Sequence, residues 1–242
     1  MPSLVNKTKT ISAKDLGKLA LLDFCPRCFW LERHFGKPPS IFPSIFSIID
    51  SLTKKSVQTA FSQTEKLPAW LELDNVSEVE GNDFLFKLPV DEGWILIGYP
   101  DDIFKLEDNS YHIVDYKTAK FTDRQDELFP MYKVQLNAYA FLAEKYGLKP
   151  VSKLSLVYCQ PKEELENCQE FKLSFDIYQL AVELDLEMVG YLLKKAREIV
   201  SLTEPPVPAH NCKGICEWLE KIINRPNSEV DALLKPGQRH GI

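Results

Sequence analysis

The sequence predicts an α/β protein with a mixed sheet, for three reasons. Four short apolar runs follow one another between residues 84 and 117, and polar turns separate them. Stretches whose apolar residues recur at helical spacing stand before and after these runs. Two more strand-like runs then precede a last long helical stretch. This order of elements is expected of a sheet that is covered by helices.

The part of the chain before residue 62 is predicted to be helical. A capping box predicts a helix over residues 12–24, and a short helix is expected around 29–31. Glycine and prolines break the chain at 36–39, and a longer helix then covers 44–61. The residues of this last helix that we expect to point inward are Ile45, Ile48, Ile49, Leu52 and Val57.

The apolar runs between residues 84 and 117 predict a meander of antiparallel strands. Turn-forming residues at 92–93 and 107–110 separate neighbouring runs. The predicted strands are 84–88, 94–98, 102–106 and 111–117.

Further along, Pro130 and Gly147 mark the start and the C-terminal cap of another helix. Two strands are expected at 153–159 and 169–175, and a long helix at 176–202. We expect a single domain over residues 1–242, with its core at about 44–202. The terminal segments of that domain are 1–43 and 203–242.

One strand end brings together residues with the chemistry of a metal site. Asp115 and Lys117 lie two apart in the predicted strand 111–117, so their side chains project from the same face. An isolated pair of this kind is usually a solvated ion pair. Here Asp101 precedes it in the segment Gly98-Tyr-Pro-Asp101. Two carboxylates beside a lysine can hold a divalent metal next to a group that steadies a phosphate.

Two further elements flank this group, with Asp50 upstream and a Gln-x-x-x-Tyr pair, Gln135 and Tyr139, downstream. The ordered set resembles the PD-(D/E)XK nuclease superfamily, in particular its RecB-type and Cas4-like branch. The segment Cys25-Pro-Arg-Cys28-Phe-Trp-Leu31 is also similar to that branch. The resemblance spans roughly Ser12 to Trp218. It implies a restriction-endonuclease-like core, a mixed central sheet flanked by helices, with a helical N-terminal and a cysteine-containing C-terminal segment.

The resemblance also implies roles for the residues that match. Asp101, Asp115 and the backbone carbonyl of Tyr116 would bind Mg²⁺ or Mn²⁺, which prefer oxygen ligands. Lys117 matches the catalytic lysine that orients or activates water. A dication next to Lys117 would lower its pKa through like-charge repulsion.

Three residues complete the implied site. Asp50 takes the place of a further metal ligand on the first core helix. Gln135 and Tyr139 share a helix face and match a pair at the edge of the family's active site. Asp102 is the rival of Asp101, because strand alternation lets only one of the two neighbours face the metal, and the match to the Gly-x-Pro-Asp segment favours Asp101.

The six cysteines fall into two classes. Two close pairs near the ends of the chain are predicted to meet in one four-thiolate metal site that clasps the termini: Cys25, Cys28, Cys212 and Cys216. The resemblance implies a [4Fe–4S] cluster, but the family has one N-terminal and three C-terminal cysteines. Zn²⁺ and no metal therefore stay open, and His210 is a possible substitute ligand. Cys159 and Cys168 fit ordinary thiols.

Composition and charge limit the classes of function. The net charge of −6 argues against a protein that coats DNA non-specifically. A local basic groove would suffice for a nuclease, and its candidates are Lys14/Lys18, Arg27/Arg33/His34/Lys37, Lys117/Lys120/Arg124 and Lys194/Lys195/Arg197. No apolar run approaches the roughly 20 residues of a membrane helix, and the first residues lack a signal-peptide core. We therefore expect a cytoplasmic protein with reduced thiols and no membrane partner.

The resemblance implies a metal-dependent deoxyribonuclease in repair, recombination or CRISPR spacer processing. Its expected partner is DNA, single-stranded or with single-stranded ends, together with a helicase or integrase. Exonuclease and endonuclease action stay open. The alternatives are a non-catalytic nucleic-acid-binding module and a docking subunit with a nuclease fold. The chain has no Gly-x-x-x-x-Gly-Lys-Ser/Thr motif, so ATP-driven unwinding would come from a partner.

Overall fold

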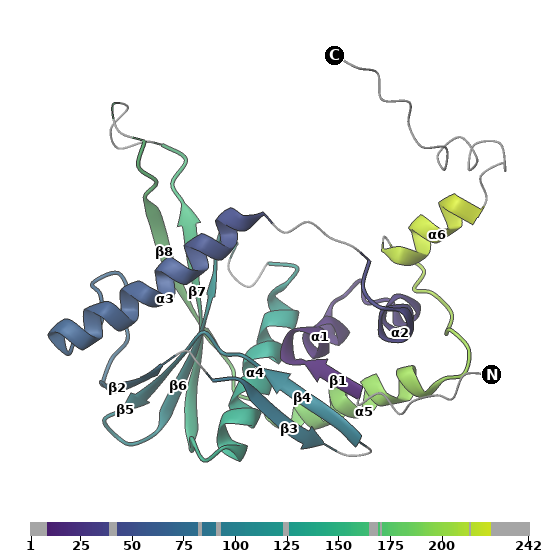
Figure 1. Ribbon diagram of the computed structural model, residues 1–242, viewed down its shortest axis with the longest axis horizontal. Helices are drawn as coiled ribbons and strands as arrows, with labels where there is room; N and C mark the ends of the chain where they lie inside the picture. The colour runs from purple at the N-terminus through teal and green to yellow at the C-terminus, as the bar shows by residue number, and fades with distance from the viewer. Residues whose placement is uncertain are drawn as a thin grey trace. The chain divides into compact units, whose positions relative to one another are not determined.

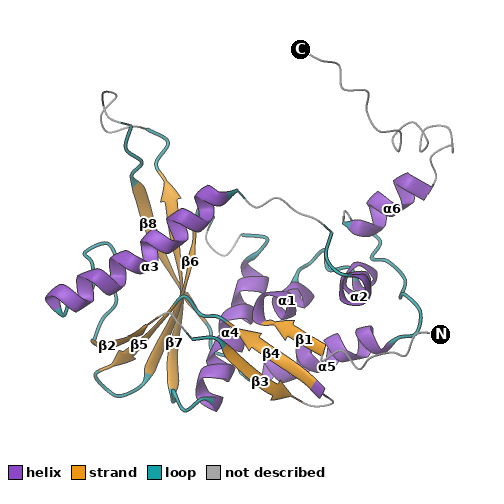
Figure 2. Ribbon diagram, in the orientation of Figure 1, coloured by secondary structure: helices purple, strands orange, loops and turns teal. Residues whose placement is uncertain are grey.

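The computed structural model describes residues 9–38, 43–81, 84–90, 93–122, 126–164, 169, 171–212 and 214–223. The chain forms both helices and strands, with the strands paired in mixed sheets, which confirms the predicted α/β class (Figure 2). The chain divides into two compact units. The larger unit comprises Met1–Leu21 and Ser40–Ala196, and the smaller unit Leu22–Pro39 and Arg197–Ile242. The single domain over 1–242 stays a prediction.

The larger unit contains the mixed central sheet that the sequence predicts. Its order is β2-β5-β6-β7-β8, and only the β6–β7 pair is parallel. The strands are β2 (Val76–Gly81), β5 (Asp102–Leu106), β6 (Tyr111–Lys117), β7 (Val151–Pro161) and β8 (Phe175–Val182). Strand β6 lies at the centre of the sheet, so both of its faces can be covered (Figure 1).

A second sheet in the same unit corrects the predicted four-stranded meander. It has the order β1-β4-β3, formed by β1 (Lys9–Ser12), β4 (Trp94–Gly98) and β3 (Phe86–Val90). Strands β4 and β5 therefore belong to different sheets, and the chain changes sheet between Gly98 and Asp102. Tyr99 and Pro100 interrupt the chain between the two strands, and pairing with β1 and β3 holds β4 in the second sheet.

Helices pack on both faces of the central sheet. Helix α3 (Ser44–Thr64) places Val57 in a cluster with Val114 and Tyr116 of β6. Helix α4 (Phe129–Lys145) lies on the opposite face, where its Gln135 reaches Asp115. The remaining helices of this unit are α1 (Ala13–Gly17), the 3₁₀ helix η1 (Lys18–Ala20) and the first part of α5 (Glu187–Ser201).

Two predictions about the extent of helices are wrong in part. The expected helix 12–24 is a short α1 followed by η1, although Ser12 does accept a hydrogen bond from the Asp15 N–H at 3.0 Å. The expected helix 176–202 begins only at Glu187. Asp185, not Asp176, accepts the N–H of Met188, while the preceding residues pair with β7 as β8.

The inward positions of α3 are also wrong in part. Val57 is buried, but Ile45, Ile48 and Leu52 are 50–60% exposed. Helix α3 packs against β2 and β6, and its buried contact is made in the turn that holds Val57. The helical spacing of apolar residues therefore identified an apolar face of α3, but it did not show how much of that face is covered by the sheet.

Among the described residues, the smaller unit contains α2 (Pro26–Phe35), the end of α5, α6 (Ile215–Ile223) and the segments beside them. Helices α2 and α6 contact each other. Side chains of α2 also bond to backbone carbonyls of the C-terminal segment. Arg27 Nε donates to Pro206 O at 2.7 Å, and Trp30 Nε1 donates to Leu202 O at 2.9 Å. These bonds join parts of the chain that are far apart in sequence. Within the described residues, no helix is both long and apolar enough to cross a membrane.

Candidate active site

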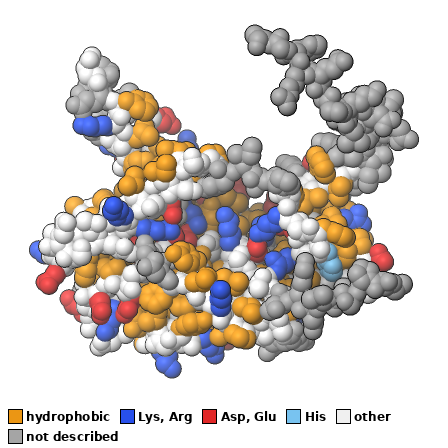
Figure 3. Space-filling view, viewed as in Figure 1, with side chains coloured by type: hydrophobic (Ala, Val, Ile, Leu, Met, Phe, Trp, Pro, Cys, Tyr) orange, Lys and Arg blue, Asp and Glu red, His pale blue; other side chains and the backbone are white. Residues whose placement is uncertain are grey.

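A cavity of about 450 Å³ lies at the end of β6 in the larger unit. Every residue that the sequence nominated for the nuclease site lines it: Asp50, Asp101, Asp115, Tyr116, Lys117, Gln135 and Tyr139. The space-filling view shows acidic and basic side chains side by side on the face drawn (Figure 3). The tertiary structure thus brings together residues of α3, β6 and α4 and the residue directly before β5.

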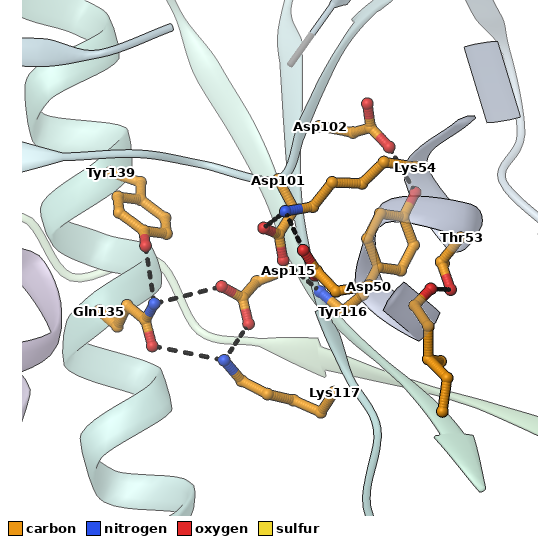
Figure 4. Close-up of polar contacts among 11 residues, drawn as sticks. Asp50, Thr53, Lys54, Asp101, Asp102, Asp115, Tyr116, Lys117, Gln135 and Tyr139 are labelled. Atoms are coloured by element: carbon orange, nitrogen blue, oxygen red, sulfur yellow. Dashed lines mark hydrogen bonds and ion pairs between the residues drawn. The ribbon is translucent and has the colours of Figure 1, made fainter. Parts of the chain in front are cut away.

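Asp115 is buried and held from two sides (Figure 4). Its carboxylate forms an ion pair with Lys117, its neighbour on the same face of β6. Gln135 Nε2 donates to Asp115 Oδ1 at 3.2 Å and to the Tyr139 hydroxyl at 2.7 Å. Lys117 Nζ in turn donates to Gln135 Oε1 at 3.5 Å. The Gln-x-x-x-Tyr pair therefore orients both Asp115 and Lys117.

Asp101 forms a second group in the same cavity. Its Oδ2 accepts the backbone N–H of Tyr116 at 2.8 Å, and its Oδ1 pairs with Lys54 Nζ at 2.7 Å. Lys54 also pairs with Asp50 Oδ2 at 2.8 Å. Lys54 thus links the carboxylate of α3 to the carboxylate that precedes β5.

The neighbouring Asp102 lies elsewhere. It is fully buried, it is absent from the cavity lining, and its Oδ2 accepts the Tyr116 hydroxyl at 2.8 Å. Alternation along the strand explains the difference, since adjacent side chains point to opposite faces. Asp101 is therefore the neighbour that shares a cavity with Asp115, while its role as a ligand stays a prediction.

Gly98 explains how α4 comes close enough to the site. A Cβ atom on Gly98 would lie 2.4 Å from Leu142 Cδ1 and 3.0 Å from Tyr139 Cδ1 of α4. Atoms at such separations overlap, so a larger residue would push the helix away. The glycine of the Gly-x-Pro-Asp segment thus serves the packing that places Gln135 and Tyr139.

Burial and neighbouring charges shift the pKa values of the site. Burial, and then the negative charge of Asp115, raise the pKa of Asp101 to about 7, against the effects of Lys54 and the Tyr116 N–H. Burial by itself would lower the pKa of Lys117, but the Asp115 carboxylate outweighs it and raises that pKa. The expected lowering of the Lys117 pKa would require a bound dication, because the protein's own groups act in the opposite direction.

The donor set of the cavity fits a hard divalent ion. Three carboxylates converge from separate elements, and oxygen ligands are those that Mg²⁺ and Mn²⁺ prefer. Asp115 Oδ2 is buried and accepts no hydrogen bond within the described residues, although Lys117 stands beside it as an ion pair. An incompletely satisfied buried oxygen is an available ligand.

Lys54 is the residue that sequence reasoning missed. Its only signal was the spacing, since Asp50 and Lys54 are four apart in a predicted helix and so share a face. That spacing is common on solvated helix surfaces. Its contact with Asp101 depends on packing between segments nearly fifty residues apart.

The smaller unit contains a second cluster, the four cysteines. Cys25, Cys28, Cys212 and Cys216 place their sulfurs within 4.8 Å of one another, which confirms the predicted convergence. The Sγ atom of Cys28 lies 3.3 Å from those of both Cys212 and Cys216, and Cys25 lies 3.7 Å from Cys216. Among the described residues, His210 is outside this group.

Burial and backbone N–H groups shift the pKa values of these thiols. Burial would raise the pKa of Cys25, but the N–H groups of Cys28 and Ala209 lower it to about 7. Burial raises the pKa of Cys28 to about 11. Cys159 is a buried free thiol in the larger unit, as expected, whereas Cys168 and Arg124 lie outside the described residues.

The sulfur separations fit one thiolate-bound ion. Four ligands about 2.3 Å from a single tetrahedral ion lie about 3.8 Å from one another. In a [4Fe–4S] cluster each cysteine binds a different iron, so the sulfurs surround a body of eight atoms. Separations of 3.3–3.7 Å for three of the sulfur pairs, with all four sulfurs within 4.8 Å, are closer to the spacing around one ion than to the wider spacing around such a body.

Comparison with known proteins places the chain in a family. Residues 48–220 match the family model described as the PD-(D/E)XK nuclease superfamily. The chain belongs to this superfamily. The letters of the family's name correspond to Pro100 and Asp101, followed by Asp115, Tyr116 and Lys117. No curated protein matches the chain significantly.

Solved structures resemble this superfamily member at low identity. SSO0001 is 17% identical, with a TM-score of 0.46, over 93% of this chain and 89% of that chain. A phage-related exonuclease from Haemophilus somnus 129PT is 14% identical, with a TM-score of 0.38, over 73% and 76%. LHK-Exo in complex with dAMP is 10% identical, with a TM-score of 0.36, over 92% and 94%.

Proposed function

We propose that this protein is a metal-dependent deoxyribonuclease that hydrolyses DNA phosphodiester bonds in the cavity at the end of β6. The proposal rests on one observation above all. The two signature segments of a nuclease superfamily bring Asp101, Asp115 and Lys117 into one cavity. A nuclease of this superfamily acts on nucleic acid, and DNA is the substrate that we propose.

Asp101 and Asp115 would hold Mg²⁺ or Mn²⁺, with Asp50 and the Tyr116 carbonyl as further ligands. A bound ion would polarise the phosphate and lower the pKa of a water molecule. In the metal-free site the Asp115 carboxylate raises the pKa of Lys117. With the ion bound, Lys117 would orient the attacking water or the phosphate by donating a hydrogen bond. Gln135 would fix its position.

The finer parts of the proposal come from the sequence motifs. They are the RecB-type or Cas4-like branch, action in repair, recombination or CRISPR spacer processing, and a preference for single-stranded DNA or single-stranded ends. A helicase or integrase partner and a cytoplasmic location belong to the same proposal.

The decisive experiment incubates the purified full chain with end-labelled single- and double-stranded DNA. Each reaction contains Mg²⁺, Mn²⁺ or EDTA, and Asp115→Asn and an exposed control, Asp74→Asn, run in parallel. We expect cleavage with Mg²⁺ or Mn²⁺ by the wild type and by Asp74→Asn only. Metal-independent cleavage, or DNA binding without cleavage under every condition, would contradict the proposal and favour a binding or docking subunit.

We further propose that the four cysteines hold a single structural Zn²⁺ that ties the two segments of the smaller unit together. The sulfur separations support one ion over the [4Fe–4S] cluster that the branch resemblance implies. The 2 + 2 arrangement of the cysteines, Cys-x-x-Cys with Cys-x-x-x-Cys, also resembles structural zinc sites more than a cluster motif. The ion would have no part in hydrolysis.

Elemental analysis tests the metal directly. Protein purified under anaerobic conditions should be colourless and contain one zinc per chain. Exchange with Co²⁺ should give the visible spectrum of a tetrahedral thiolate complex. A brown protein with iron, acid-labile sulfide and absorbance near roughly 400 nm would overturn the zinc assignment. Absence of any bound metal would overturn the shared site itself.

A further inference from the structure

Lys54 occupies the space between two of the proposed metal ligands. Its ammonium group lies 2.7 Å from Asp101 Oδ1 and 2.8 Å from Asp50 Oδ2 (Figure 4). Its side chain is only 14% exposed, so solvent screens the pair with Asp101 weakly. The helical spacing of Asp50 and Lys54 fixes one contact, and the packing of α3 on the central sheet fixes the other.

This arrangement conflicts with a metal ion at the same oxygens. Asp101 already uses both carboxylate oxygens, one on Lys54 and one on the Tyr116 N–H. A bound Mg²⁺ would lie about 2.0–2.1 Å from its ligand oxygens and therefore close to the ammonium group. Like charges at such a separation repel strongly when water is largely excluded. A metal ion and the Lys54 ammonium group therefore compete for Asp101.

The charges of the ion-paired groups show what this competition can achieve. When all three carboxylates are ionised, they and the two ammonium groups of Lys54 and Lys117 leave the set with one net negative charge. Binding of a dication makes the net charge of the set positive, and binding of a phosphodiester, with its single negative charge, then makes the set neutral. Without Lys54 the set would already be neutral with the dication alone.

We propose that Lys54 is the built-in counter-ion of the metal site and a further catalytic residue. It holds Asp50 and Asp101 together before metal binds, it yields Asp101 to the ion, and its ammonium group then contacts a phosphate oxygen of the substrate. Metal binding is thereby weakened in the absence of DNA and favoured in its presence. This inference rests on the proposed metal-dependent hydrolysis.

The test compares Lys54→Met with Lys55→Met. Lys55 is the exposed neighbour on the same helix, so the matched control makes the same chemical change outside the cavity. Isothermal calorimetry of the full chain with Mn²⁺, without DNA, should give a dissociation constant roughly tenfold lower for Lys54→Met than for wild type. At saturating Mn²⁺, Lys54→Met should have a kcat roughly tenfold lower, because the phosphate contact is lost. Lys54→Arg should retain the metal affinity of wild type, since it keeps the positive charge.

The opposite signs of these two effects distinguish the proposed role from a structural one. A residue that only supported the fold would weaken metal binding and catalysis together when replaced. Equal or weaker Mn²⁺ binding by Lys54→Met, while wild type binds Mn²⁺ normally, would overturn the counter-ion role. A tighter-binding Lys54→Met with unchanged kcat would overturn the phosphate contact. Failure of wild type to bind Mn²⁺ at all would instead refute the proposed metal site, and this inference with it.

Discussion

The acidic cavity of the larger unit and the cysteine cluster of the smaller unit differ in how the negative charge of their clustered side chains is balanced. In the cavity, three carboxylates are paired with the ammonium groups of Lys54 and Lys117. In the cluster, the groups that act on the thiols are backbone N–H groups and the other cysteines. The cavity therefore has its own positive charge, whereas deprotonated cysteines would depend on a bound cation.

This difference separates the two sites in chemistry as well as in stability. The carboxylate site can remain folded without a metal, which suits an exchangeable Mg²⁺ or Mn²⁺ that acts on substrate. Four converging thiolates repel one another until an ion neutralises them, which suits a permanent structural metal. Four experiments test or refine this contrast.

The largest expected effect is the loss of cleavage when the Asp115 ligand is removed. Asp115→Asn should lower kcat/KM by about a thousandfold or more, which is about 4 kcal/mol of transition-state stabilisation. Lys117→Ala should act similarly, because both groups face one cavity. Asp102→Asn should keep most activity, since Asp102 bonds to Tyr116 outside the cavity. Activity of folded Asp115→Asn near that of wild type would refute the metal assignment.

The cysteine cluster should matter for stability instead. Loss of a structural ion costs several kcal/mol, so Cys28→Ser should lower the melting temperature by about 10 °C. Cys159→Ala, a buried cysteine outside the cluster, should lower it by about 3 °C. Differential scanning calorimetry with zinc analysis measures both. Equal shifts would show that the cluster holds no stabilising metal.

His112 shows what burial does without an ion-pair partner. It lies in β6 like Asp115, and burial, followed by the charge of Lys153, lowers its pKa to about 4. The unfolded chain binds a proton near pH 6.5 while the folded chain does not, so stability falls as the pH drops from about 6.5 towards 4. His112→Gln should abolish about 2–3 kcal/mol of this loss between pH 7 and 4.5. Urea unfolding at both pH values measures it, and parallel pH dependence of the two proteins would contradict the prediction.

The smallest effect concerns the residues that position the charged pair. Gln135→Ala removes the donor to Asp115 and the acceptor of Lys117, and should lower activity by about 10–100-fold. Tyr139→Phe removes only the oxygen that accepts from Gln135, so we expect a loss of less than about tenfold. A greater loss for Tyr139→Phe than for Gln135→Ala would show that the hydroxyl acts directly.

The sequence by itself determined the parts of this protein that depend on local patterns. The alternation of residues 111–117 put Asp115 and Lys117 on one face of a strand, and helical spacing put Gln135 and Tyr139 on one face of α4. The two cysteine pairs predicted a shared site, because pairs of thiols separated by two or three residues are typical of metal ligands. In each case, the periodicity of a segment or a short motif is enough to predict which side chains lie together.

Only the tertiary structure decided how distant segments meet. It showed that Lys54 bridges Asp50 and Asp101, and that β4 and β5 belong to different sheets. It also showed that the segment beginning at Asp176 continues as a strand, because pairing with β7 outweighs its capacity to cap a helix. The physical reason is common to all these cases. Packing between elements chooses among local conformations of similar free energy, and that choice depends on neighbours that no local pattern contains.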